Sequence, residues 1–251
     1  MAERLDIALV HRGLCESRTA AQKAIREGRA LLGGLPCLKP SVLIEANDAI
    51  TLTGDAPRYV GRGGEKLEGA LHDFGIDPTG CMVLDVGAST GGFADCLLQH
   101  GAHGIIAIDV GHGQLHPRMA ADARVISVEG FNARGLNAQS LTERIGPLPP
   151  LSGCTVDVSF ISLTHILPGI KSVLMPDAWC CVLVKPQFEC GPSALDRHGV
   201  VKRESDRAAA LARVMEAAQI LGFEYMGNTP SRLRGGDGNV EKFVYLCNRS
   251  S

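Results

Sequence analysis

The sequence lacks the bulk positive charge of proteins that bind nucleic acid with their whole surface. Its 251 residues include 25 lysines and arginines against 27 acidic residues, which gives a formal net charge of -2 at pH 7. Any contact with nucleic acid must therefore come from local basic patches. Aromatic residues are also few, at 4%, but hydrophobic residues at 45% suffice for a packed core.

Long apolar runs and metal-type cysteine spacings are missing as well. No window reaches the ~18 apolar residues that a membrane span requires. Residues 1–14, MAERLDIALVHRGL, carry charges among their apolar positions and have no cleavage signature. The nine cysteines are odd in number and form no C-x-x-C pair. We therefore expect a cytoplasmic protein with reduced cysteines, no membrane segment and no metal site.

The most informative stretch is VLDVGASTGGF, residues 83–93, which has the pattern of a strand, a glycine-rich turn and a helix N-terminus. This arrangement holds nucleotide-like ligands at the carboxyl edge of an α/β sheet. The glycine spacing differs from the dinucleotide fingerprint of oxidoreductases, and the lysine of a phosphate-binding P-loop is absent. An acidic strand end suits an amino group or a sulfonium. We interpret the stretch as an S-adenosylmethionine (SAM) loop; the alternative is an α/β turn without a ligand.

Later residues extend the expected cofactor site. A second strand, residues 104–109, ends in an aspartate whose carboxylate is placed to accept hydrogen bonds from ribose hydroxyls. An asparagine after a third strand is placed to meet the adenine edge. The expected cofactor contacts are Asp85, Gly87, Ser89, Thr90, Gly91, Gly92, Phe93, Asp109, Val110 and Asn132.

From residue 82 on, strand patterns alternate with helical patterns, which predicts an α/β fold. Further strands are expected within 124–128, 153–163, 178–189, 223–227 and 240–247. The prediction is a Rossmann-like sheet of the SAM-dependent methyltransferase type, mostly parallel with an antiparallel last strand. Residues 205–221 are expected to form an amphipathic helix with Ala209, Leu211, Ala212, Val214, Met215 and Leu221 near one face.

Residues 1–54 are expected to form a separate α+β module, followed by a linker at 55–63 and the methyltransferase domain at 64–251. Two helices precede a hairpin that turns on Gly33 and Gly34, and Thr19 and Gln22 are placed for a capping box. Basic residues around the second helix suit a phosphate backbone, although a solvated helix face is the alternative. The candidate RNA contacts are Arg4, Arg12, Arg18, Lys23, Arg26, Arg29, Arg58 and Arg62.

Four ionisable residues in four different elements are expected to meet at the carboxyl edge of the sheet. Lys66 lies in the first turn of a helix, Asp157 and Lys185 lie near the ends of two apolar strands, and Glu241 begins the last strand. A lysine at the end of a buried strand is costly unless it is paired or functional. The set suits attack of a ribose hydroxyl on a sulfonium methyl group. Lys185 would accept the proton or position the oxygen, Asp157 and Glu241 would orient the lysines, and Lys66 would hold the ribose.

Six stretches resemble the TlyA (haemolysin A) family of ribosomal RNA methyltransferases, whose catalytic domain is of the FtsJ/RrmJ type: YVGRGGEKL, VLDVGASTGGFADCLLQHGA, AIDVGHGQL, VDVSFISL, LVKPQFE and GNVEKFVYL. Another, SRTAAQKAIREGRALLGG, is similar to the RNA-binding domain first described in ribosomal protein S-four. The resemblance covers nearly all of residues 1–249. It implies SAM as cofactor, a Lys-Asp-Lys-Glu tetrad at the four positions above, and 2′-O-methylation of cytidine in ribosomal RNA of ribosomal subunits. Gly61 and Lys242 depart from the family pattern, which has serine and more often an aromatic residue there.

Two alternatives remain at this point. The family's older name allows a membrane-active protein, although the sequence has no strongly cationic amphipathic helix. A non-catalytic RNA-binding or ribosome-assembly factor is the other, and the complete tetrad argues against it. The sequence leaves the oligomeric state and the modified nucleotide open.

Overall fold

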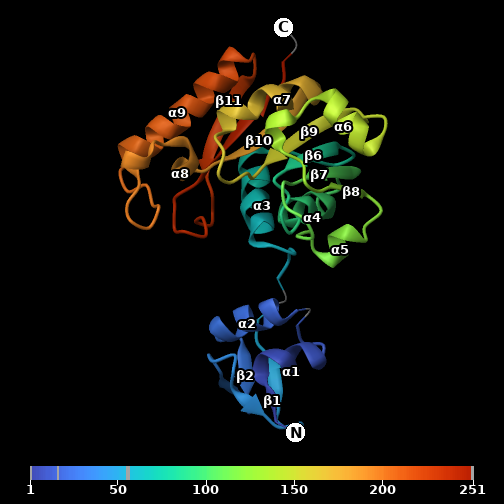
Figure 1. Cartoon of the computed structure of the whole chain (residues 1–251), viewed down its shortest axis with the longest axis vertical. Coiled ribbons are helices and arrows are strands. Elements are labelled where there is room, and N and C mark those ends of the chain that lie inside the picture. Colours follow the sequence, from blue (N-terminus) through green and yellow to red (C-terminus); the bar gives the residue numbers. More distant parts are fainter. Residues whose placement is uncertain (1, 16, 55–56, 250–251) are drawn as a thin grey trace. The chain divides into compact units, whose positions relative to one another are not determined.

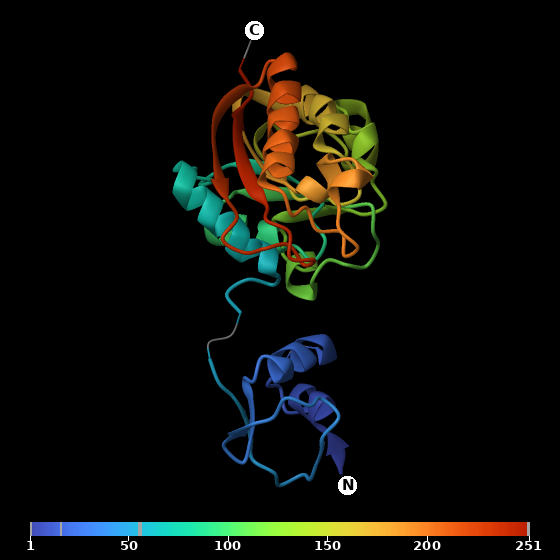
Figure 2. The ribbon, with the colours of Figure 1, turned by 90° about the vertical axis from the view of Figure 1, so that its left-hand side faces the viewer.

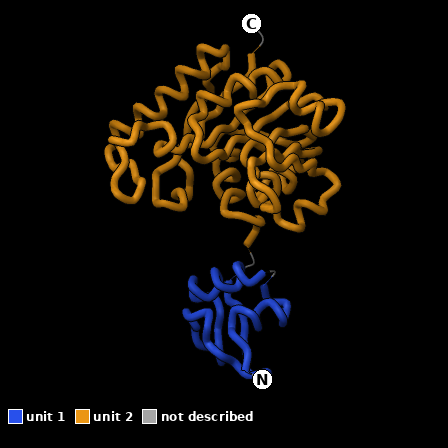
Figure 3. Tube along the Cα trace, viewed as in Figure 1, with its two compact units in different colours: residues 1–56 blue, residues 57–251 orange. Residues whose placement is uncertain are grey.

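The computed structural model describes residues 2–15, 17–54 and 57–249, and the chain forms two compact units, residues 1–56 and 57–251 (Figure 3). Residues 55 and 56 of the expected linker lie outside the described residues. In the rest of that stretch Pro57, Arg58 and Arg62 are exposed, and the other residues are buried or half-buried. Tyr59 is 3% exposed and belongs to a hydrophobic core of the second unit, because its ring packs against the start of the following helix.

The first unit is a small α+β domain (Figure 1). Its helices are α1 (Leu5–His11) and α2 (Arg18–Arg26). Strands β3 (Leu35–Pro36), β2 (Ala30–Leu32) and β5 (Ile50–Leu52) form one sheet in this order, and β1 (Glu3–Arg4) pairs with β4 (Leu43–Ile44) in another. The hairpin from β2 to β3 turns on Gly33 and Gly34 as predicted, with φ of 58° and 84°. Apolar side chains from both helices and from β2, β4 and β5 form its core.

The predicted capping box of α2 is wrong. The side chain of Ser17 caps the helix by accepting a hydrogen bond from the Ala20 N–H at 3.2 Å. Gln22 instead donates its side-chain amide to Asp6 Oδ2 at 2.7 Å. A tertiary contact with α1 thus takes the residue that the local pattern assigns to the cap.

The second unit is built on a seven-stranded sheet, and the predicted fold class is confirmed. The order of strands is β11-β12-β10-β9-β6-β7-β8. Strand β12 runs antiparallel to both of its neighbours, and the five strands β10, β9, β6, β7 and β8 run parallel to one another. The strands are β6 (Met82–Val86), β7 (Gly104–Ile108), β8 (Val125–Val128), β9 (Leu151–Val156), β10 (Leu174–Val184), β11 (Glu224–Pro230) and β12 (Lys242–Cys247).

Helices cover both faces of this sheet (Figures 1 and 2). One hydrophobic core joins it to α3 (Arg62–Phe74) and α4 (Gly92–Gln99), and the other joins it to α6 (Ala138–Ile145), α7 (Leu167–Val173) and α9 (Glu204–Ile220). Cys180 and Cys181, neighbours on β10, fall into opposite cores because successive strand residues point to opposite faces. The short helices are α5 (Pro117–Ala120), α8 (Pro186–Glu189), η1 (Ala133–Gly135), η2 (Leu163–His165) and η3 (Pro192–Ala194).

The buried face of α9 agrees with the predicted one only in part: Val214 is buried and Leu211 packs against the core as predicted, but the alanines differ. Its buried residues are Ala210, Val214 and Ala218, spaced four apart, whereas Ala209 and Ala212 are exposed. Alanines occur all round this helix, so the apolar pattern alone does not single out the stripe that packs on the sheet.

Asp6 is the polar centre of the first unit. Its side chain has no exposed surface and accepts hydrogen bonds from Arg4 Nε at 2.9 Å, Arg18 Nε at 2.9 Å and Gln22 Nε2 at 2.7 Å. These donors, Arg4 above all, hold the pKa of Asp6 well below its ordinary value, against the opposing effect of burial.

We expect Asp6→Asn to lower the free energy of unfolding of the first unit by about 2 kcal/mol at pH 7, because two guanidinium groups lose their carboxylate. The folded-state pKa is depressed, so the wild-type stabilisation is complete above the unfolded carboxyl pKa of about 4 and is lost as the pH falls towards the lower folded-state value. Hydrogen exchange of the α1 and α2 amides in the full chain measures the loss. Asp48→Asn, at an exposed turn of the same unit, is the control. Unchanged protection in Asp6→Asn would contradict the prediction.

Candidate active site

The sheet topology brings three residues of the expected tetrad to one edge. Asp157 follows β9, Lys185 follows β10 and Glu241 precedes β12. Because β10 lies between β9 and β12, and β12 is antiparallel, these three positions share the carboxyl edge of the parallel strands. The fourth residue, Lys66, comes from the first half of α3.

The four side chains form two ion pairs of different exposure. Lys66 Nζ lies 2.6 Å from Glu241 Oε2, and Lys185 Nζ lies 2.7 Å from Asp157 Oδ1. The first pair is buried, with side chains 10% and 2% exposed, whereas Lys185 and Asp157 are 13% and 23% exposed. A buried ion pair is retained only when both charges stay compensated. The Lys185–Asp157 pair is therefore the half of the set that is more open to a substrate.

Lys185 has a further partner that sequence reasoning did not assign. Its Nζ donates a hydrogen bond to Ser159 Oγ at 3.0 Å. The next residue, Phe160, has a left-handed φ of 63° and is 91% exposed, and its ring lies 5.1 Å from that of Phe188 on α8. The only sequence signal was the Ser-Phe pair directly after the strand in VDVSFISL.

Glu189 links the loop that carries Asp157 to the helix that follows Lys185. This carboxylate is 3% exposed and lies at the end of α8. Its Oε1 accepts the Leu163 N–H at 2.8 Å and its Oε2 accepts the Ser162 hydroxyl at 2.6 Å. Sequence reasoning missed Glu189, because only the folded chain shows that its partners lie on another segment.

The glycine-rich loop after β6 adopts the predicted strand, turn and helix arrangement. Gly87 and Gly91 have φ of 85° and 87°, and Ser89 also has a positive φ, 49°. A Cβ at Gly87 would lie 2.6 Å from the backbone oxygen of Asp157, and one at Gly91 would lie 2.8 Å from the Leu115 side chain. The glycines thus let the loop pass close to the Asp157 segment.

Asp109 holds this loop and the next one together. Its Oδ2 accepts the Ser89 N–H at 2.8 Å, and its Oδ1 accepts the Gly111 N–H at 2.7 Å. Each carboxylate oxygen has a second acceptor site, which suits it to bind ribose hydroxyls as well. Val110, next to it, is 71% exposed. Asn132 uses its side-chain oxygen to cap η1, accepting the Arg134 N–H at 3.0 Å, so that oxygen is already engaged.

Asp85 is buried within β6 and has no exposed surface. Thr155 Oγ1 donates a hydrogen bond to its Oδ1 at 2.8 Å, and its Oδ2 has no hydrogen-bond partner among the described residues. Burial raises the pKa of Asp85 to about 7, against the lowering effect of the Thr155 bond and with a further raising effect of Asp157. The sequence predicts a ligand contact here, but the side chain is covered by protein.

The segment that precedes α3 packs on the glycine-rich loop. A Cβ at Gly61 would lie 2.6 Å from Thr90 Oγ1, and a Cβ at Gly92 would lie 3.1 Å from the Gly64 nitrogen. The Val60 N–H also donates to Asp95 Oδ2 on α4 at 2.8 Å. A serine at position 61, as the family pattern has it, would therefore require the Thr90 side chain to shift.

Several of the predicted RNA contacts have partners within the protein. Arg4 and Arg18 bind Asp6, as described above, and Lys23 and Arg29 lie 3.8 and 3.3 Å from Glu27. In the second unit, Arg58 forms an ion pair with Glu68 and Arg62 donates to the Arg234 backbone oxygen at 3.1 Å. Arg26 is exposed on α2.

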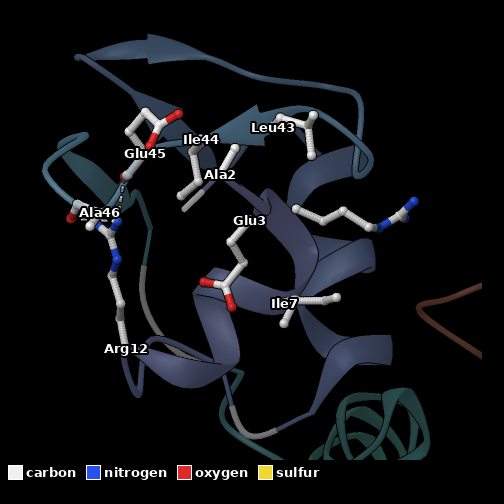
Figure 4. Close-up of a pocket in the computed structure, with 9 residues that line it drawn as sticks. Ala2, Glu3, Ile7, Arg12, Leu43, Ile44, Glu45 and Ala46 are labelled. Carbon is white, nitrogen blue, oxygen red and sulfur yellow. Dashed lines mark hydrogen bonds between the residues drawn. The ribbon is translucent and has the colours of Figure 1, made fainter.

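Arg12 has a structural contact beside a surface pocket of the first unit (Figure 4). Its guanidinium donates to the backbone oxygens of Asp48 at 2.6 Å, Ala46 at 3.0 Å and Glu45 at 3.1 Å. The pocket has a volume of about 610 Å³, and its lining includes both Glu3 and Glu45. The four residues of the tetrad belong to the other unit.

Across residues 2–15, 17–54 and 57–249, no group of three or more histidine, cysteine, aspartate or glutamate residues is placed to hold a metal ion. No helix in the same part of the chain is long and apolar enough to cross a membrane.

Comparisons with known proteins agree with this architecture. Residues 59–248 match the FtsJ-like methyltransferase family, and residues 3–50 match the S4 domain. The chain is 41% identical to the 16S/23S rRNA (cytidine-2′-O)-methyltransferase TlyA of Mycobacterium tuberculosis, over 97% of this chain and 89% of that protein. It is 37% identical to Hemolysin A of Brachyspira hyodysenteriae, over 97% and 99% of the two chains. A solved structure from Streptococcus thermophilus, provisionally named a hemolysin, is 36% identical with a TM-score of 0.77 and covers 100% of this chain and 90% of that chain.

The raised pKa of Asp85 leads to a prediction about stability. Between pH 4 and 7 the Asp85 carboxyl is ionised in the unfolded chain but keeps its proton in the folded one. Rising pH in this window therefore favours the unfolded chain and lowers the free energy of unfolding. Asp85→Asn keeps an acceptor for Thr155 but does not ionise. We expect its free energy of unfolding, relative to that of the wild type, to be about 3 kcal/mol higher at pH 8 than at pH 5.

Urea unfolding of both proteins at the two pH values measures this difference. Asp77→Asn replaces an exposed carboxyl whose pKa is lowered by its bonds to Thr79, and should show no such gain. A wild-type to Asp85→Asn difference that is the same at pH 5 and pH 8 would refute the prediction.

Proposed function

Because this chain belongs to the FtsJ-like methyltransferase family and carries an S4 domain ahead of the catalytic domain, we propose that it methylates the 2′-hydroxyl of a cytidine in ribosomal RNA. The protein is a SAM-dependent methyltransferase by family. The observation that carries the proposal is the partly exposed Lys185–Asp157 pair at the sheet edge that also bears the glycine-rich loop. The TlyA relative, named for 2′-O-methylation of cytidine in 16S and 23S rRNA, supports the substrate.

The residues after β6 and β7 fit the cofactor. Asp109 would bind the ribose hydroxyls, and the loop from Gly87 to Gly91 would pass along the cofactor with little side-chain bulk. Asp85, whose side chain is covered by protein, would support the end of β6 through its hydrogen bond with Thr155 rather than by direct contact with the cofactor. When bound, SAM supplies the methyl group, and its carbon–sulfur bond breaks, with the electron pair kept by sulfur, as the new oxygen–carbon bond forms.

Lys185 would act on the nucleophile. A ribose hydroxyl is a weak nucleophile until its proton is removed or its oxygen is held in line with the methyl group. In its neutral form, Lys185 would receive that proton at Nζ, with the Asp157 carboxylate at 2.7 Å stabilising the ammonium group that forms. Lys66 would hold the ribose, kept in place by the buried Glu241 at 2.6 Å.

The first unit would bind structured ribosomal RNA through phosphate contacts and shape. Lys23 and Arg26 on α2 offer exposed positive charge, and Arg18 remains 56% exposed despite its bond to Asp6. Arg12 would contribute less, because its guanidinium is engaged by backbone oxygens. We propose ribosomal subunits as the partner and the cytoplasm as the place of action.

The main experiment transfers labelled methyl groups from SAM to ribosomal subunits purified from a strain that lacks this protein. The product is digested and mapped by mass spectrometry. Label on a ribose 2′-oxygen of a cytidine is the expected result. SAM binding without label on either subunit would contradict the proposal and favour a non-catalytic RNA-binding role.

We expect Lys185→Ala to lower the rate of methyl transfer by about 10³-fold, because it removes the proton acceptor. SAM affinity should change by less than about twofold, since Lys185 faces the nucleophile. Single-turnover assays and calorimetric titration with SAM measure the two effects. Lys171→Ala, at a lysine on α7 that bonds backbone oxygens, is the control. Loss of SAM binding in Lys185→Ala would place this lysine in the cofactor site instead.

We expect Asp109→Ala to weaken SAM binding by about 10- to 100-fold, because the ribose hydroxyls lose a charged acceptor and the Ser89 and Gly111 N–H groups lose theirs. The same calorimetric titration measures the effect. Normal affinity in this variant would show that the carboxylate only shapes the loops.

A further inference from the structure

The hydroxyl of Ser159 lies where it can determine the direction of the Lys185 amine. Lys185 Nζ is 3.0 Å from Ser159 Oγ and 2.7 Å from Asp157 Oδ1, and the lysine side chain is 13% exposed. A lysine nitrogen is tetrahedral, with one position bonded to carbon and three free. The hydrogen bond to Ser159 takes one of these directions, whereas the contact with Asp157 is a close ion pair in which Asp157 Oδ1 has no hydrogen-bond partner among the described residues.

Ser159 is held in place by contacts at both ends of its loop. At the beginning, the Asp157 N–H donates to the Val86 backbone oxygen at 2.9 Å. At the other end, buried Glu189 binds Ser162 and the Leu163 N–H. Phe160 reverses the chain immediately after Ser159 through its left-handed backbone. The hydroxyl is therefore presented to Lys185 by a segment that is anchored on both sides of Ser159, which is itself exposed.

A hydroxyl suits this position chemically. It accepts a hydrogen bond from an N–H of the lysine whether the nitrogen is protonated or neutral, so the contact can persist while a proton is transferred. It also adds no second negative charge beside Asp157; such a charge would favour the ammonium form, which has no lone pair to accept the proton.

We propose that Ser159 is a positioning residue for Lys185: its hydroxyl fixes one of the three free directions at Nζ by a hydrogen bond, beside the Asp157 ion pair, and so aims the amine at the 2′-hydroxyl of the substrate. The proposal rests on the proposed function, since it aims the amine at that hydroxyl. Without the Ser159 hydroxyl, the amine can rotate about the end of its side chain and spend only part of its time aimed at the substrate.

The test compares Ser159→Ala, Ser159→Thr and wild type in steady-state methylation of ribosomal subunits. Ser159→Ala should lower kcat by about 10- to 100-fold, the effect of a misaligned catalytic group, while KM for the subunits and the Kd for SAM stay within about twofold. Ser159→Thr keeps the hydroxyl and should recover most of kcat. Ser172→Ala removes an exposed hydroxyl on α7 that bonds the Gly169 oxygen, and should behave as wild type.

Each other outcome overturns the proposal in a distinguishable way. If Ser159→Ala keeps the wild-type kcat, Ser159 does not position the lysine. A raised KM for the subunits with unchanged kcat would make Ser159 an RNA contact. Equal losses in the alanine and threonine variants, with lowered melting temperatures, would make its role structural. Inactive wild-type protein would remove the proposed function itself, and this proposal with it.

Discussion

A charged lysine at the end of a buried strand is the constraint on which the site depends. Residues 178–184 of β10 are buried throughout, and the chain then reaches Lys185. An ammonium group at such a position costs several kcal/mol unless it is paired. Asp157 and Ser159 provide the partners, and both lie on the segment after the neighbouring strand β9. The parallel pairing of β9 and β10 makes this possible because both strands end at the same edge.

The same edge is held by contacts that are not themselves catalytic. Glu189 fixes the far end of the Ser159 segment, and the backbone of Asp157 lies so close to Gly87 that a side chain there would collide with it. The Asp109 carboxylate then joins the glycine-rich loop to the loop after β7. The proposed proton acceptor and the proposed cofactor loop are thus connected through packed backbone, which gives their relative position little freedom.

Charge is used differently in the two units. In the first, Arg4, Arg12 and Arg18 bind groups of the protein itself, either buried Asp6 or backbone oxygens. In the second, two lysines and two carboxylates compensate each other within the site. With a net charge of -2, any contact with nucleic acid has to come from local positions rather than from bulk charge.

The sequence by itself determined the elements and the chemistry they carry. The alternation of strands and helices, the glycine-rich loop after Asp85 and the hairpin on Gly33 and Gly34 all follow from local patterns, because spacing and glycine content act over a few residues. Tertiary structure alone decided which charges pair, that Gln22 reaches Asp6 instead of capping α2, and which side of α9 is buried. It also decided that Ser159 and Glu189 belong to the site. These contacts join residues distant in sequence, and their partners are chosen by strand order and register, which no local pattern encodes.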